Sequence, residues 1–132
     1  MHFNMSVLVV KRSVASHSAT VKSLLAAIER RGLKVFARVD HAAAARETGL
    51  ALEEEEVVLF GSPRAGTPLM LSDRRIGIEL PLRILVWRDG ADVQLAYSDP
   101  RDLAEEYEVA EHRSTLEQMA KLLGELTSEA AS

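Results

Sequence analysis

The stretch LPLRILVWRDGADVQLAYSDP, residues 80–100, decides the fold. Apolar residues alternate through Arg83–Arg88 and again through Asp92–Tyr97. The Asp89-Gly90 dipeptide between them is typical of a tight turn that accepts positive φ. The pattern predicts an antiparallel β-hairpin, with both faces of its first strand largely apolar. Leu80-Pro81-Leu82 opens that strand, where proline is tolerated.

The elements before the hairpin follow from hydrophobic periodicity. They are a strand over Met5–Val10, a helix over Ser16–Arg31, a strand over Lys34–Val39, a short helix over His41–Glu47 and a strand over Val57–Phe60. The acidic run Glu53–Glu56 before the last of these strands is expected to be solvated, because adjacent carboxylates repel one another. One long helix early and a hairpin late favour an α+β fold, in which helices cover one face of an antiparallel sheet.

The rest of the chain reads as an irregular stretch and two C-terminal helices. Gly61–Leu71 contains two glycines and two prolines, so helix is expected only from Thr67-Pro68 onward. One helix follows Asp99-Pro100, and the other carries a wide apolar stripe over Leu116–Leu126. Residues 1–127 are predicted to form one α+β domain, and residues 128–132 a frayed C-terminal tail.

Composition narrows the function classes. The 132 residues are 47% hydrophobic and 27% charged, as in globular proteins. Cysteine is absent, which excludes disulfides and thiolate chemistry, and the net charge of −4 argues against wide binding to nucleic acid. The apolar run Val7–Val10 is too short to span a bilayer, so we expect a cytoplasmic protein without a membrane partner. The four histidines are scattered, and neither a metal site nor a cofactor is predicted.

Several local motifs resemble the domain of unknown function 302 family. They are Asp40-His41-Ala42 with Ala45 and Gly49, the stretch FGSPRAGTPLM, the strand entry LPL, and Tyr97 with Asp99-Pro100. The resemblance runs in order from about Ser16 to Leu126, and Ser62 departs from it, because the family more often has asparagine there. It implies a β-α-β(4)-α topology, like one repeat of the TATA-box-binding protein, and a homodimer. It implies no established activity.

Asp40 and His41 lie where a strand ends and a helix begins. A histidine there could act as a general acid or base, since its reference pKa is near neutrality. The structural alternative is that Asp40 caps the short helix and His41 occupies its first turn. Both interpretations stay open at this point.

The second candidate is the loop Gly61–Pro68. Thr67 and the free amides after it could hold an anion, and Arg64 could add charge. The alternative is a tight surface excursion without a ligand. We expect this loop to converge with the end of the second strand into one small-molecule site, which is lined by Asp40, His41, Phe60, Gly61, Ser62, Thr67 and Met70.

These observations favour a homodimeric binding domain for a small molecule or a protein partner. An enzyme that uses His41 as acid and base on an unknown small substrate is the alternative. The sequence does not decide whether the protein is an enzyme, because His41 has no recognised catalytic partner.

Overall fold

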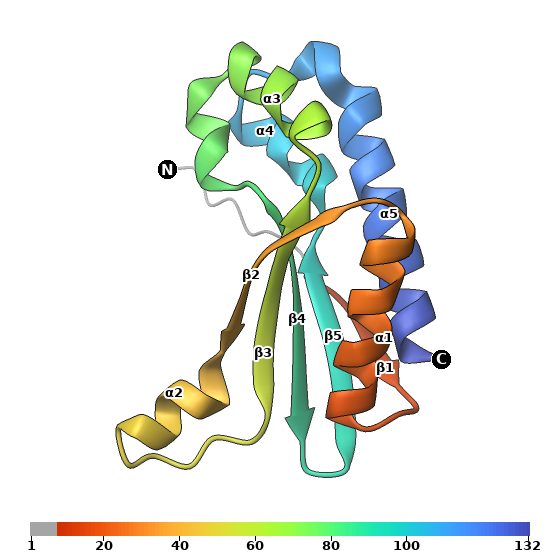
Figure 1. The fold of residues 1–132 in the computed structure, drawn as a ribbon. Helices are drawn as coiled ribbons and strands as arrows, with labels where there is room; N and C mark the ends of the chain where they lie inside the picture. Colours follow the sequence, from red (N-terminus) through yellow and green to blue (C-terminus); the bar gives the residue numbers. More distant parts are fainter. Residues whose placement is uncertain (1–7) are drawn as a thin grey trace.

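The computed structural model describes residues 8–132, and Figure 1 shows their arrangement. Five antiparallel strands form one sheet in the order β1-β5-β4-β3-β2. The strands are β1 (Leu8–Ser13), β2 (Lys34–Asp40), β3 (Glu55–Gly61), β4 (Leu82–Asp89) and β5 (Asp92–Ser98). The α-helices are α1 (His17–Arg30), α2 (His41–Glu47), α3 (Pro63–Ser72), α4 (Leu103–Glu106) and α5 (Arg113–Ala131). Residues 8–132 also contain three short 3₁₀ helices: η1 (Arg74–Ile78), η2 (Pro100–Asp102) and η3 (Ala110–His112).

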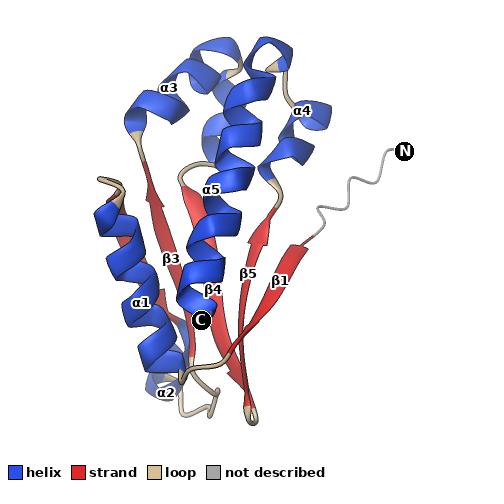
Figure 2. Ribbon diagram, turned by 90° about the vertical axis from the view of Figure 1, so that its right-hand side faces the viewer, coloured by secondary structure: helices blue, strands red, loops and turns tan. Residues whose placement is uncertain are grey.

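The predicted α+β class and β-α-β(4)-α topology are confirmed. Once α2, α3 and the short helical turns are set aside as insertions, the order is β1, α1, β2 to β5, and α5. Helices α1 and α5 lie side by side over one face of the sheet, as Figures 1 and 2 show. The opposite face carries no helix over its central strands (Figure 2).

The hairpin prediction is confirmed as well. Leu85 pairs with Ala96, and the pairing continues to Asp89 and Asp92. The loop between them has two residues, and its first, Gly90, has φ of 61°. That left-handed conformation favours glycine because glycine has no Cβ.

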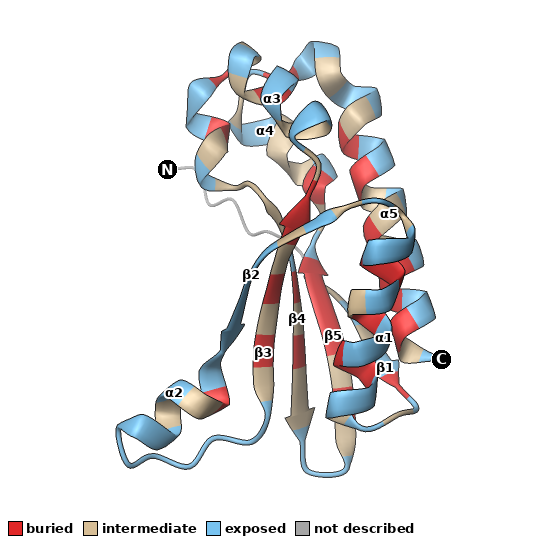
Figure 3. Ribbon diagram, viewed as in Figure 1, coloured by how far each residue is buried: buried red, intermediate tan, exposed pale blue. Residues whose placement is uncertain are grey.

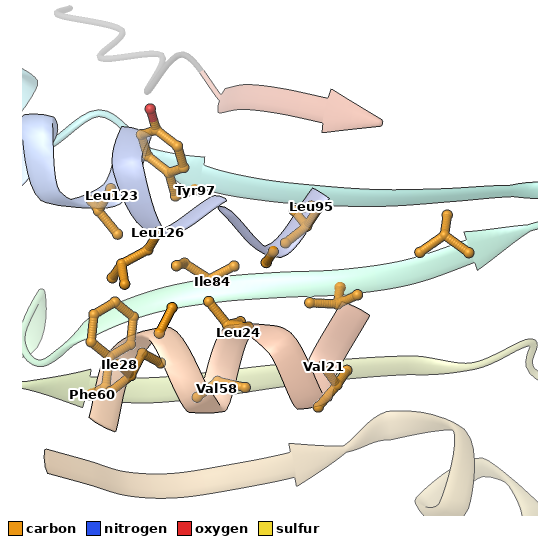
Figure 4. Packing of buried hydrophobic residues seen from close by; sticks show 14 residues of the cluster. Val21, Leu24, Ile28, Val58, Phe60, Ile84, Leu95, Tyr97, Leu123 and Leu126 are labelled. Atoms are coloured by element: carbon orange, nitrogen blue, oxygen red, sulfur yellow. The ribbon is translucent and has the colours of Figure 1, made fainter. Parts of the chain in front are cut away.

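The main core lies between the sheet and the two long helices (Figures 3 and 4). Leu24 and Ile28 of α1 meet Leu123 and Leu126 of α5 over the inward residues of the sheet, and all four are at most 1% exposed. Burying one such side chain contributes about 1.5–3 kcal/mol. The apolar stripes of α1 and α5 therefore fix both helices on this face.

The N-terminal strand and its join to α1 differ in bounds from the prediction. Residues Met5–Val7 of the expected strand lie outside the described residues, and β1 continues to Ser13. Ser13 is buried and its hydroxyl lies 2.6 Å from that of Thr20, which satisfies both groups. Ser16 caps α1 as expected, since its hydroxyl accepts the amide of Ala19.

The prediction for Gly61–Leu71 is wrong in its first half. Helix α3 begins at Pro63, five residues before the expected first helical residue Pro68, with Ser62 as its N-cap residue. Proline suits the first helical position because its fixed φ matches the helix and its missing amide has no partner there. Pro68 lies inside the helix and removes the amide that would bond to the carbonyl of Arg64.

The frayed tail at residues 128–132 is also a wrong prediction. Helix α5 continues to Ala131, and Ala130 is completely buried. The amide of Val14 donates to the carbonyl of Ala131 at 3.0 Å, and Lys11 donates to the hydroxyl of Ser128 at 2.7 Å. The last turn of α5 stays helical because it packs beside the start of the chain's first loop, a contact that composition alone does not reveal.

Candidate functional site

The sheet register separates the two predicted halves of the site. In the antiparallel pair of β2 and β3, Asp40 lies opposite Glu56, whereas Gly61 lies opposite Lys34. Five residues of strand separate these ends, a span of about 17 Å. Figure 1 shows the consequence: α2, which begins at His41, and α3 lie at opposite ends of the sheet. The expected convergence is therefore wrong, because neighbouring antiparallel strands bring the end of one to the start of the next.

At the α2 end, Asp40 is a helix cap. Its carboxylate accepts the amide of Ala43 at 2.8 Å, and this supports the structural interpretation of the Asp40-His41 pair. His41 is exposed in the first turn, and no hydrogen bond joins it to the described part of the chain. His41 also borders a hollow on the sheet face opposite α1 and α5, together with Glu55 and Arg83, but no hydrogen bond within residues 8–132 orients its imidazole.

At the other end, four of the predicted residues share one hollow of about 420 Å³. It lies between α3, the start of β2, the segment from η1 to β4, and the middle of α5. Its lining is Leu33, Phe36, Leu59, Gly61, Ser62, Pro63, Ala65, Gly66, Thr67, Met70, Gly77, Leu80, Pro81, Leu82, Met119 and Leu122. None of these side chains is charged. A hollow of this size with apolar walls is typical of small-molecule sites.

Phe60 does not belong to this lining. Successive residues of a strand point to opposite faces, so Leu59 borders the hollow while Phe60 enters the core and is completely buried. Figure 4 shows its ring beside Ile28 of α1. The prediction that Phe60 lines the ligand site is therefore wrong.

Three glycines belong to the lining of the hollow. A Cβ on Gly66 would lie 3.4 Å from Leu80 Cδ1, and one on Gly77 would lie 3.3 Å from the sulfur of Met70. A Cβ on Gly61 would meet Pro81 at 3.8 Å. None of the three has a positive φ. Only the contact at Gly77 is tighter than an ordinary van der Waals contact, so space favours glycine at that position alone.

Two hydroxyl groups are the polar features of the lining. Ser62 is the N-cap residue of α3, yet its side chain makes no cap hydrogen bond. Its carbonyl instead accepts the amides of Ala65 and Gly66, at 3.1 and 3.2 Å. Thr67 is exposed on the first turns of α3. Both hydroxyls can therefore bond to a ligand without giving up a bond within the described residues.

An ion-pair network fixes the wall formed by η1. Asp73 is buried, and its carboxylate accepts bonds from the guanidinium of Arg75 and from the amide of Glu108. The bonds from Arg75 hold the pKa of Asp73 well below its usual range. Glu79 accepts the hydroxyl of Tyr107 at 2.8 Å, which together with burial raises the pKa of that tyrosine to about 12. These contacts tie η1 to the segment before α5.

The sequence reasoning missed the residues that α5 and β2 contribute to the hollow, chiefly Phe36, Met119 and Leu122. One signal was available: the apolar stripe of α5 is wider than a single core contact needs, and Leu122 lies at its margin. Arg64 was expected to add charge to an anion site, but it is exposed and does not line the hollow.

Comparison with known proteins places this geometry in a family. A solved structure of an uncharacterised conserved protein from Bacillus stearothermophilus matches with a TM-score of 0.84 at 13% identity, over 93% of this chain and 97% of that chain. At this identity the match shows the fold alone.

Curated relatives named "Fluoride-specific ion channel FluC 1" occur in Brucella suis biovar 1 (strain 1330) and Brucella abortus biovar 1 (strain 9-941). Each is 43% identical over 101 residues, which are 76% of this chain but 40% and 37% of the relatives. The chain thus spans less than half of their length. None of the helices described in this chain has the length and apolar character needed to cross a membrane.

The family model described as "Domain of unknown function DUF302" matches residues 9–126, nearly all of the described chain. The chain therefore belongs to the DUF302 family.

Proposed function

We propose that this domain is a homodimeric binding module that holds a small, largely apolar molecule in the hollow between α3 and α5. The observation that carries the proposal is the uncharged lining of about 420 Å³, which includes Gly61, Ser62, Thr67 and Met70. Apolar walls with a few polar groups provide affinity and orientation respectively.

The lining also defines the ligand chemistry. Without a charged side chain, the hollow cannot compensate the desolvation of an ionic group. A neutral ligand with a hydroxyl or carbonyl group fits, because Ser62 and Thr67 can bond to one polar atom while the rest contacts leucine and methionine side chains.

The relatives named as fluoride channels support the interpretation that this domain can occur in one chain with a second region of different function. In them the matching region is the smaller part of the chain. A bare fluoride ion suits the hollow poorly, since no cationic side chain lines it. We infer that the domain contributes ligand binding beside a separate activity rather than ion conduction itself.

The enzyme alternative has weaker support, because no hydrogen bond within residues 8–132 joins His41 to a second titratable group. His41 lies at the α2 end of the sheet, away from the hollow between α3 and α5, and Asp40 is engaged as a helix cap. Binding without catalysis is therefore the function that the geometry supports best.

The test is a titration with N-phenyl-1-naphthylamine, a neutral apolar dye whose fluorescence rises on burial. We expect saturable binding at one dye per chain. Gly66→Leu should weaken it at least about tenfold, because the new side chain fills the hollow beside Leu80. Ala44→Leu, on the exposed surface of α2, adds the same side chain elsewhere and should leave binding unchanged. Absence of saturable binding to the original protein, or equal binding by Gly66→Leu, would contradict the proposal.

The homodimer part of the proposal has its own measurement. Light scattering at micromolar concentration should give twice the chain mass of 14.5 kDa. A mass of one chain would refute the dimer and leave the ligand proposal to the dye titration.

A further inference from the structure

The face of the sheet opposite α1 and α5 has an unusual composition. We call it the open face. Its apolar outward residues on the central strands are Val57, Leu59, Leu85, Trp87 and Ala96, which lie beside the polar outward residues Glu55, Arg83 and Gln94. In a sheet with one solvated face, such positions are normally polar. Here most of them are apolar, although the other face already packs against two helices (Figure 2).

The edges of the open face are apolar as well. Leu8 and Val10 on β1 are 57% and 47% exposed, and Val39 on β2 is 41% exposed. A hollow of about 450 Å³ on this face is lined in part by Leu8, Val57, Leu85 and Ala96, and also by charged residues that include Glu55, Arg83 and Glu106. Apolar side chains that are bordered by charged groups are typical of an interaction site.

One carboxylate on this face is left without an arginine. In the acidic run Glu53–Glu56, which leads into β3, Glu53 and Glu54 pair with Arg88, and Glu56 is buried against Arg38. The sequence-based expectation of a wholly solvated run is therefore wrong at Glu56. Glu55 points to the open face by alternation and has no ion-pair partner among residues 8–132.

One arginine on the same face is only weakly paired. Arg83 is half exposed, and its contact with Glu79 measures 3.7 Å. Arg83 and Glu55 line the same hollow, but they lie too far apart along the strands to pair within one chain. Glu55 is opposite Trp87, and Arg83 is four residues before Trp87, about 13 Å along the strand.

The register makes this separation symmetric. Val57 is opposite Leu85, and Glu55 and Arg83 each lie two residues from that pair, in opposite directions along the strands. A twofold axis that crosses the strands at Val57 and Leu85 would place Glu55 of one copy against Arg83 of the second copy, twice. A twofold interface requires such self-complementarity.

We propose that the open face packs against the open face of a second copy about this twofold axis, with reciprocal Glu55–Arg83 pairs flanking an apolar centre. The inference rests on the proposed homodimer and names its surface. Five strands about 4.8 Å apart and about 20 Å long give a projected area of roughly 480 Å². This projected area is smaller than the roughly 800 Å² per partner of a standard interface, so we expect a weak dimer that dissociates on dilution.

The test is a charge exchange followed by sedimentation velocity over a concentration series. Glu55→Arg and Arg83→Glu each place like charges together, so each should raise the dimer dissociation constant at least about tenfold. The double variant restores opposite charges and should return the constant to within about threefold of the original. Glu29→Arg, on the exposed surface of α1, is the matched control and should have no effect.

Tryptophan emission provides a second readout of the same face. Trp87 is the chain's one tryptophan, and it lies on the open face. Its emission should shift to longer wavelength as the dimer dissociates on dilution.

The outcomes are distinguishable. A monomeric original protein would refute the homodimer and this interface together. A dimer that tolerates both single variants, or that the double variant does not restore, would refute the interface and leave the homodimer standing. Dye binding in the α3 hollow is measured separately in each case.

Discussion

The two phenylalanines Phe60 and Phe36 provide a direct test of where the core ends and the hollow begins. Phe60 is completely buried between the sheet and the long helices, whereas Phe36 is 45% exposed on the edge strand β2. The same substitution to alanine at both positions changes the chemistry equally and the packing very differently.

Phe60→Ala should cost about 4 kcal/mol, since truncation of a buried phenylalanine leaves a cavity that the core fills incompletely. For 132 residues the unfolding entropy is about 280 cal/mol/K, so this cost lowers the melting temperature by roughly 14 °C. Phe36→Ala loses partial burial and the contact between its ring and Lys34, 5.3 Å from the centroid, which together amount to about 1 kcal/mol or 4 °C.

The assay is thermal unfolding followed by circular dichroism at neutral pH, combined with the dye titration. Phe60→Ala should retain dye binding at temperatures where it remains folded, while Phe36→Ala should weaken the binding. If Phe60→Ala lowers the melting temperature no more than Phe36→Ala does, the assignment of Phe60 to the core is refuted.

Three further predictions concern the periphery. Bonds from Arg31 lower the pKa of Glu129 to about 2, so the unfolded chain binds more protons than the folded chain in acid. The melting temperature should therefore fall from about pH 4.5 toward pH 2, and it should fall less in Glu129→Gln. Absorbance at 295 nm should show a tyrosine that titrates near pH 12 and disappears in Tyr107→Phe. Deletion of residues 128–132 should lower the melting temperature, because it removes the buried Ala130. An unchanged melting temperature would indicate that these residues do not pack stably against the domain.

Local periodicity was sufficient to predict most of the elements. The stripe of α1, the alternation of β4 and β5, and the cap at Asp40 each depend on residues within a few positions of one another, and each is confirmed. The predicted start of α3 is wrong because Pro63 is assigned to the irregular stretch and Pro68 to the first helical position, whereas Pro63 holds that position. Pro63 is compatible with a helix start, and its position relative to the helix decides its effect.

The arrangement of the site could not be predicted in the same way. Whether Asp40 meets Gly61 depends on which strands are neighbours and in which direction they run, and neither is encoded near those residues. The pairing of β2 with β3 places Lys34, at the start of β2, beside Gly61. The position of a strand end relative to another strand end depends on the order and direction of the strands in the sheet.

The number of apolar residues in the sequence nevertheless indicates that some of them lie outside the core, although it does not indicate where. Both faces of β4 and a wide stripe on α5 exceed what one core between a sheet and two helices can bury. The structure divides this excess between two places: Leu122 of α5 borders the hollow, while Leu85 and Trp87 of β4 lie on the open face. Burial of these apolar side chains by a ligand or a second subunit would lower the free energy of the chain in water. The same excess therefore supports both proposals, and the charge exchange and the Gly66→Leu variant perturb its two parts independently.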